Sequence, residues 1–378
     1  MHISDPKASS LLTLTPSRWA GECPLRGGGG PVRTTRSAPA RGSQRGGTVV
    51  AWTLIVAVAC YAGAKIGVLA QLTPGGVTPI WPPPGVELAA LLLLGKRGLP
   101  GVVLGMVLAH VYTRDGLPLL PAATLLPLGS VTAALCAYLL LRRAGFRIAL
   151  DRLRDGLALV FLGALVSMLI SSTVGTTTDL AFGVIPASDW WRTWFVWWAG
   201  DAMGVLLITP LLLGMSRIRW RERIPVLRVA EFVALLAGVL CAGLLSSTVS
   251  SVLLVLAFPL VCWAAFRFQL AGAALCALLV SVAVTIGVGQ GLFGGPNLSS
   301  DMAVLQAVNG SVALTALLIS AVIAQRSALH TQAQRVCRQL AMLARAGARI
   351  GGAQGVVESA CELARVCTPE FADASWST

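Results

Sequence analysis

Charged residues are scarce in this sequence. Asp, Glu, Lys and Arg together make up 12% of its 378 residues, whereas hydrophobic residues make up 56%. Soluble domains carry about a quarter charged residues, so this composition excludes an ordinary soluble domain. The chain is instead expected to be solvated by lipid over most of its length.

Acidic residues are especially rare, with 16 Asp and Glu against 29 Lys and Arg, which leaves a formal net charge of +13. Such a charge can mark a nucleic-acid-binding protein. Here the arginine clusters fall in breaks between apolar stretches and form no continuous basic face. The sequence therefore predicts no nucleic-acid partner, and the basic breaks are predicted to be loops on one side of a membrane.

The residue pairs and clusters that bind metals or perform catalysis are missing as well. The nine cysteines contain no CxxC pair, and they are predicted to be small core residues. The three histidines, His2, His110 and His330, lie in no Cys, Ser or acidic pattern suited to nucleophilic or metal chemistry. The sequence thus predicts no metal, no cofactor and no enzymatic activity of its own.

Apolar stretches of membrane-spanning length are abundant. From Thr48 to Gln325 one follows another with only short breaks, and at about 20 residues per crossing this region supplies roughly eight to ten spans. We therefore expect an all-α polytopic transmembrane helical bundle over residues 48–325. Residues 1–47, with their glycines, prolines and arginines, are expected to be a disordered basic tail, unless translation starts near Thr48.

Arginine-rich loops set the expected orientation. Arginines crowd residues 142–154 and 217–228, and both loops fall on the same side whether eight or ten crossings are counted. The positive-inside rule places that side in the cytoplasm, with both chain termini there. The lipid bilayer is therefore the principal expected partner.

A proline-rich turn opens one of the shorter spans. Trp81 stands before three prolines, the first two being Pro82 and Pro83, and these are followed by Gly85. Consecutive prolines remove backbone donors and prevent a preceding helix from continuing, so a rigid entry at the membrane interface is predicted, with Trp81 as its aromatic anchor. Glu87 follows inside an apolar run, where an acid is a candidate functional residue unless it simply faces water.

A tryptophan-rich span carries the second acid. Trp197 or Trp198 and Asp201 continue a series of tryptophans at three- and four-residue steps, so they are predicted to share one helical face, and Pro210 follows near the end of the span. An aromatic belt at the membrane interface explains the first tryptophans. Asp201, about two turns below the belt, requires a partner.

Three glycine pairs with three residues between their members are predicted to let neighbouring helices approach closely. The pairs are Gly63 and Gly67, Gly101 and Gly105, and Gly200 and Gly204. The last pair flanks Asp201, so this acid is expected beside a close helix contact.

Lys65 lies within the first apolar stretch and has two interpretations. It either snorkels to the outer interface or serves as the counter-ion of a buried acid such as Asp201. The second interpretation is relevant because a lysine in the middle of the bilayer costs roughly 2.5–3.5 kcal/mol on insertion scales. The sequence alone leaves both open.

A family resemblance emerges from these motifs. The Trp-Pro-Pro-Pro-Gly turn at 81–85 and the Trp-Trp-Ala-Gly-Asp segment at 197–201, in this order, resemble the first class of bacterial membrane-associated sensor (MASE) domains over about residues 50–325. The resemblance implies an integral input module of the bacterial inner membrane, attached to histidine kinases, diguanylate cyclases or serine phosphatases. Glu87 departs from the small or apolar residue that is usual after this turn.

An apolar seam continues beyond the last span. Its residues recur at steps of four, three, four and three, which predicts a coiled-coil linker over residues 326–350 and a homodimer formed through it. The alternative is an amphipathic tail on the membrane surface. The seam consists of Leu329, Ala333, Val336, Leu340 and Leu343.

The last residues, 351–378, resemble the opening of a GAF domain of the kind that precedes bacterial phosphatases. Only a helix pattern of that domain is present, and a domain of this class cannot form a core from it. A truncated GAF-like start is therefore expected, with a cytoplasmic output domain missing from this chain.

Two function classes follow. The first is a sensory module that passes an unknown membrane, lipid or small-molecule stimulus to the linker helix. Its site would be shaped by Trp81, Pro82, Pro83, Gly85, Glu87, Trp197, Trp198, Gly200, Asp201, Gly204 and Pro210. The alternative is a small-molecule transporter or membrane enzyme with a polar intramembrane pathway. That pathway would consist of Lys65, Glu87, Asp201, Gln290 and Gln306. The heptad seam favours the sensory module.

Overall fold

A computed structural model describes residues 43–71, 78–113, 118–218, 225–248, 251–289 and 298–351. All regular elements in these ranges are helices, and the ranges contain no strand. Eight segments of the described residues are long and apolar enough to cross a membrane. The predicted all-α polytopic bundle is thereby confirmed.

The elements follow one another along the chain with short connections. The first half contains α1 (Ser43–Leu69), α2 (Pro83–Leu94), η2 (Gly95–Gly98), α3 (Leu99–Thr113), α4 (Leu119–Arg143), α5 (Leu153–Ala158), the π-helix η3 (Leu159–Val166) and α6 (Met168–Ala181). The second half contains η4 (Ala187–Asp189), α7 (Trp190–Met215), α8 (Val226–Thr248), η5 (Ser251–Leu256), α9 (Ala257–Gly289) and α10 (Leu298–Gly351).

The two ends of the chain are described only in part. Helix α1 begins at Ser43, a few residues before the predicted start of the membrane domain at Thr48. The rest of the expected basic tail lies outside the described residues. The expected GAF-like start also lies outside them, because the description ends at Gly351.

Helices α2 and α3 form a hairpin. Gly95 ends α2 with a φ of +62°, a conformation that glycine adopts without strain, and η2 then turns the chain back. Helix α3 packs on α1 through its predicted glycine pair. A Cβ atom at Gly101 would lie 2.7 Å from the Thr53 carbonyl oxygen, and one at Gly105 would lie 2.7 Å from the Cys60 Cβ. The order of these contacts makes α3 parallel to α1.

A second hairpin lies within α9. Gln269 has a φ of 56° and a ψ of −153°, far from helical values, and the chain reverses there. The first half of α9 runs antiparallel to α8 and the second half runs parallel to it, as the facing residues show. These pairs are Phe232 with Phe268 and Gly238 with Leu260 before the break, and Phe232 with Gly272 and Gly243 with Ala283 after it.

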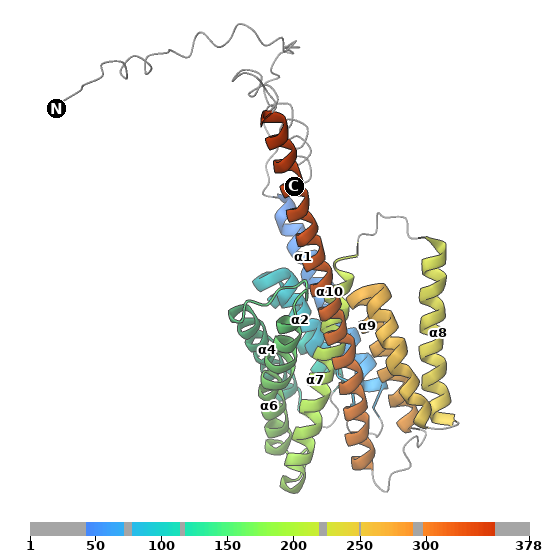
Figure 1. Cartoon of the computed structure of the whole chain (residues 1–378). Coiled ribbons are helices and arrows are strands. Elements are labelled where there is room, and N and C mark those ends of the chain that lie inside the picture. The colour runs from blue at the N-terminus through green and yellow to red at the C-terminus, as the bar shows by residue number, and fades with distance from the viewer. Residues whose placement is uncertain are drawn as a thin grey trace, which may run out of the picture. The chain divides into compact units, whose positions relative to one another are not determined.

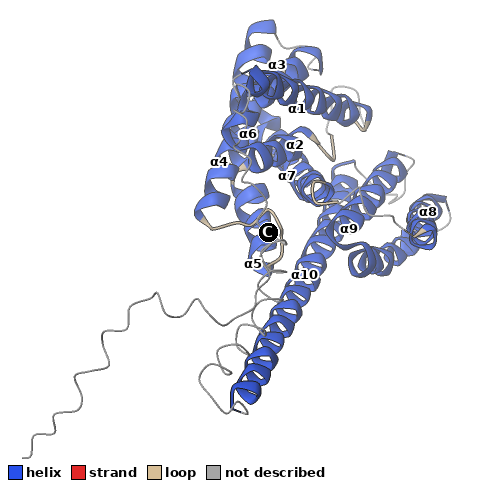
Figure 2. Ribbon diagram, turned by 90° about the horizontal axis from the view of Figure 1, so that it is seen from above, coloured by secondary structure: helices blue, strands red, loops and turns tan. Residues whose placement is uncertain are grey.

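Helix α7 occupies the centre of this packing. It contacts α2, α6 and η3 as well as α9 and α10, and Figure 2 shows it between the group that contains α2, α4 and α6 and the group that contains α8 and α9. Its residues from Ala199 to Leu207 are all buried. A side chain on this part of α7 is therefore placed to contact several helices at once.

Helix α10 leaves this packing as one continuous rod. It runs for 54 residues, and Figure 1 shows its end extending beyond the neighbouring helices. Its first half is partly buried against α7 and α9, whereas residues 327–341 are all exposed. The predicted linker thus continues the last span without a break.

Candidate functional site

Residues 78–85, which we call the Trp81 turn, pack on α7 through their backbone. Prolines fill the first turn of α2, where helices leave N–H groups without internal partners, so the missing donors leave nothing unsatisfied. Trp81 precedes them and donates its own N–H to the Gly200 carbonyl at 3.1 Å. The two motifs singled out from the sequence are therefore joined by a hydrogen bond.

Glycines make this contact possible because backbone meets backbone. A Cβ atom at Gly200 would lie 2.8 Å from the Thr78 carbonyl oxygen, and one at Gly204 would overlap the Trp81 carbonyl oxygen. A Cβ atom at Gly85 would in turn overlap the Gly204 carbonyl oxygen. The predicted pair on α7 is thus the surface that receives the turn.

Two side chains hold the turn from either side. Thr209 of α7 donates its hydroxyl to the Gly85 carbonyl at 3.1 Å. Gln306 of α10 donates its amide to the Pro79 carbonyl at 2.8 Å. The helix that leaves the bundle as the linker therefore contacts the turn directly.

The first glycine pair, on α1, receives the side chains of the same turn. A Cβ atom at Gly67 would lie 2.6 Å from the Trp81 ring, and one at Gly63 would lie 3.3 Å from the Pro82 Cβ. Trp81 therefore has its ring on α1 and its backbone on α7. Two helices that are far apart in the sequence clamp this residue.

Trp197 and Trp198 face different parts of the neighbouring span. The Trp197 ring covers Gly175 of α6. The Trp198 indole N–H donates to the Leu165 carbonyl at 2.8 Å. Leu165 belongs to the π-helix η3, an irregularity that recurs at functional sites in helical proteins. The Trp198 ring also stacks on Trp194, with ring centroids 6.2 Å apart.

The two acids lie in the same interface. Glu87 and Asp201 are 0% and 1% exposed, and they interact electrostatically across the contact of α2 with α7. Ser130 of α4 lies beside Glu87, and Ser171 of α6 lies beside Asp201. All four carboxylate oxygens nevertheless lack a hydrogen bond of ordinary geometry. An ionised acid buried without a partner costs several kcal/mol, so ionisation of both acids is strongly disfavoured.

Lys65 is not their counter-ion. Its side chain is exposed and donates to the Tyr112 carbonyl at 3.1 Å, and its Nζ lies 5.6 Å from the centre of the Tyr61 ring. The counter-ion interpretation is therefore wrong, because the long side chain turns away from the bundle toward the end of α3. The snorkelling interpretation stays a prediction.

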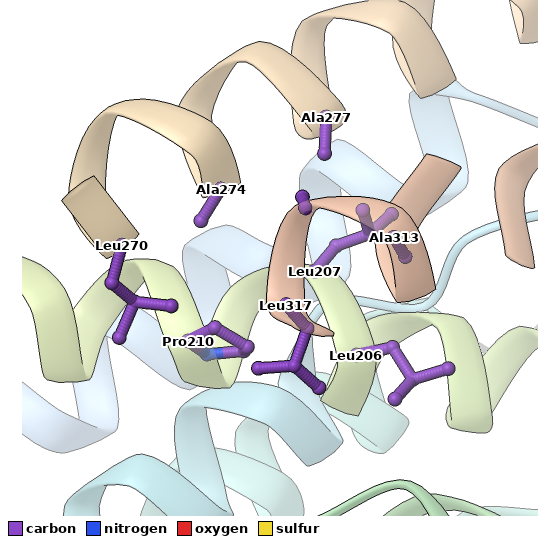
Figure 3. Close-up of a pocket in the computed structure, with 9 residues that line it drawn as sticks. Leu206, Leu207, Pro210, Leu270, Ala274, Ala277, Ala313 and Leu317 are labelled. Atoms are coloured by element: carbon purple, nitrogen blue, oxygen red, sulfur yellow. The ribbon is translucent and has the colours of Figure 1, made fainter. Parts of the chain in front are cut away.

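Pro210 marks a small apolar void between α7, α9 and α10 (Figure 3). Its missing N–H removes one internal bond of α7, the one to the Leu206 carbonyl. The void measures about 10 Å³, which leaves room for one water molecule at most. Its lining consists of Leu206, Leu207, Pro210, Leu270, Ala274, Ala277, Ala313, Ala316 and Leu317.

Some polar residues escaped the sequence analysis. Ser130 and Ser171 are each 5% exposed, and Asn309 of α10 is wholly buried with neither amide atom hydrogen-bonded. A single small polar residue in an apolar run has no spacing that would reveal it. Its depth within a span is the only available signal, as it is for Glu87.

The proposed transport pathway does not assemble. Lys65 and Gln306 make separate backbone contacts, and Gln290 lies outside the described residues. The described residues also contain no group of three or more His, Cys, Asp or Glu that could hold a metal ion. The arrangement is a tightly packed helix junction with a buried acid pair.

The model of the MASE1 family matches residues 52–327. No curated protein and no solved structure matches the chain.

Proposed function

The chain belongs to the MASE1 family of membrane-associated sensory input domains of signal-transduction receptors, and on this basis we propose that the contact of the Trp81 turn with α7 is its stimulus-responsive part. The transporter alternative is not favoured. In this proposal α10 is the output element, which carries a change at the turn out of the membrane.

The observation that carries this proposal is the continuity of α10. Gln306 near its beginning holds the turn through Pro79, and a Cβ atom at Gly310 would lie 3.7 Å from the Met203 side chain of α7. Further along, Gln325 accepts a hydrogen bond from the Leu153 N–H at the start of α5. The same helix then continues as the linker. A displacement of the turn is therefore coupled by direct contacts to the helix that leaves the bundle.

We propose that two copies of the chain pair through the linker. The seam side chains Leu329, Val336, Leu340 and Leu343 are 59%, 47%, 60% and 67% exposed in one copy. Apolar residues at heptad steps on a helix in water are stabilised by a facing helix. A surface-bound tail would instead bury this face in the lipid headgroups. The direct continuation from α10 favours pairing, because paired helices have discrete registers that a sensor can switch between.

We further propose the orientation and the output. Basic residues gather at one end of the spans, at η2, at 142–154, at Arg267 and on the linker, so this end and both termini are placed in the cytoplasm of a bacterial inner membrane. The linker would then lead to the GAF-like residues 351–378 and to a phosphatase, kinase or cyclase output.

The linker proposal is tested by cross-linking single cysteines in native membranes. The starting variant carries serine at Cys23, Cys337, Cys361 and Cys367 and alanine at the five cysteines within the spans, so that each introduced cysteine is the only one. Val336→Cys on the seam should form a disulfide-linked dimer, and Leu340→Cys should do the same. Thr331→Cys, on the opposite face of the same helix, is the matched control and should remain monomeric.

Two results would contradict this mechanism. Monomers at all three positions under every condition would remove the dimeric linker. Equal cross-linking at Thr331 and Val336 would show collisions between copies rather than a defined seam. The family membership of the chain is independent of either outcome.

A further inference from the structure

Glu87 and Asp201 have no chemical task in the sensory mechanism described so far. Both are entirely enclosed, on α2 and α7, in the interface that the Trp81 turn completes. Their four carboxylate oxygens are all buried and have no hydrogen bond of ordinary geometry, and Ser130 and Ser171 are the polar side chains beside them. Such side chains either hold a ligand or exist in a neutral form.

The groups around the pair offer no compensating charge. Ser130 faces the pair from α4 and Ser171 faces it from α6, while Cys60 of α1 lies within interaction range of Glu87. On α3, His110 is hydrogen-bonded through its Nδ1 to the Met106 carbonyl at 2.9 Å. Within the part of the chain that the structure describes, no Lys or Arg forms an ion pair with either acid.

We propose that Glu87 and Asp201 form a proton-binding site, in which a proton held by the pair keeps the contact of α2 with α7 closed. A protonated carboxyl group can donate its O–H to the serine hydroxyl beside it, and an ionised partner can accept from its own serine, so donor and acceptor are both satisfied. The pair then carries one negative charge instead of two. Proton binding by the pair does not depend on the proposed sensory role. Only the transmission of its loss to α10 rests on that role.

A proton fits this site better than a metal ion. Calcium takes six to eight oxygen ligands and magnesium demands near-octahedral coordination, usually with several waters. The pair offers two carboxylates and two hydroxyls from four helices, and the turn packs against α7 backbone to backbone beside it. A proton requires no cavity and no change in helix spacing.

Loss of the proton would act on the junction itself. Two negative charges would then face each other in an interface without counter-ions, and they would repel. The acids are enclosed on α2 and α7, which meet backbone to backbone at Gly204 and the Trp81 carbonyl. Separation of the turn from α7 is the available response, and Gln306 would transmit it to α10.

The test is infrared difference spectroscopy of the full chain in lipid nanodiscs. A protonated buried carboxyl group gives a C=O stretching band that ionised acids lack. The wild-type protein should show this band at neutral pH, and it should diminish as the pH rises. The double substitution Glu87→Gln with Asp201→Asn should abolish it. Glu231→Gln is the matched control, because Glu231 is ion-paired with Arg267 at 2.8 Å, and it should leave the band unchanged.

Each outcome decides the proposal. Absence of a pair-dependent band in the wild type at neutral pH would overturn it. Loss of the band when sodium is added at constant pH would also overturn it, in favour of a metal-cation site. If the double variant does not fold, Glu87→Asp and Asp201→Glu keep both acids and should shift the band rather than remove it, and an unshifted band would assign it elsewhere. A failed linker cross-link leaves this spectrum unaffected, so the two proposals can fail separately.

Discussion

The substitution Gly204→Ala tests the central contact of the molecule most directly. The added methyl group would overlap the Trp81 carbonyl oxygen, which is part of the backbone and cannot turn aside as a side chain can. The turn must therefore move away from α7. This movement weakens the hydrogen bond from Trp81 to Gly200.

The expected magnitude follows from opposing effects. Overpacking of a tight interface costs about 1–3 kcal/mol. Weakening of one buried backbone hydrogen bond adds about 1 kcal/mol. The higher helix propensity of alanine returns about 1 kcal/mol. We expect the free energy of unfolding to fall by about 2 kcal/mol.

Gly238→Ala supplies the matched control. Gly238 also lies within a membrane span, but a Cβ atom there would lie 3.7 Å from the nearest Leu260 atom, which is ordinary contact. This variant should be as stable as the wild type or more stable by up to about 1 kcal/mol. The two substitutions share their chemistry and differ in the space available.

Denaturant-induced unfolding of the purified protein in detergent micelles measures both variants. The reasoning predicts a difference of roughly 2–3 kcal/mol between Gly204→Ala and Gly238→Ala. Equal stability of the two variants would refute the close contact between the Trp81 turn and α7. The full loss of stability in Gly204→Ala combined with unchanged linker cross-linking would show that displacement of the turn is not transmitted to α10.

Two further substitutions probe buried polar groups in the same unfolding assay. Trp198→Phe removes the indole N–H that the Leu165 carbonyl accepts and should lower the free energy of unfolding by about 1–2 kcal/mol. Trp263→Phe is the control and should be near zero, because its exposed indole N–H donates only a long bond of 3.4 Å to Glu231. No loss for Trp198→Phe would mean that η3 needs no donor from α7. Asn309→Leu should raise the free energy of unfolding by about 1–2 kcal/mol, because it removes a buried amide without partners, and a loss of stability would show that this amide has an unseen partner.

Local sequence features predicted the helix packing surfaces but not their partners. The glycine pairs at 63 and 67, 101 and 105, and 200 and 204 all face closely approaching segments, as expected from their spacing. Spacing within one helix says nothing about the register between helices. That Gly204 receives Trp81 depends on how distant spans assemble, which a local pattern does not encode.

The sequence likewise predicts some residues of the candidate site and not others. The depth of Glu87 and Asp201 in apolar runs marked them as candidates, and both are buried. The sequence leaves Lys65 two possible positions, at the membrane interface or beside a buried acid, because its long flexible side chain can reach either. The hydrogen bond to the Tyr112 carbonyl excludes the position beside the acids. Ser130 and Ser171 are not predicted, because an isolated serine in an apolar run belongs to no motif and does not change the hydrophobic pattern.

The length of α10 turns small movements in the membrane into large ones outside it. From Gln325 to Gly351 the helix extends roughly 40 Å at about 1.5 Å per residue. A tilt of about 5° at the Gln325 end would sweep the far end through roughly 3.5 Å, nearly two-thirds of a helical pitch. A shift too small to disturb the packed junction is thus amplified by leverage into a displacement of several ångströms at the far end of the helix.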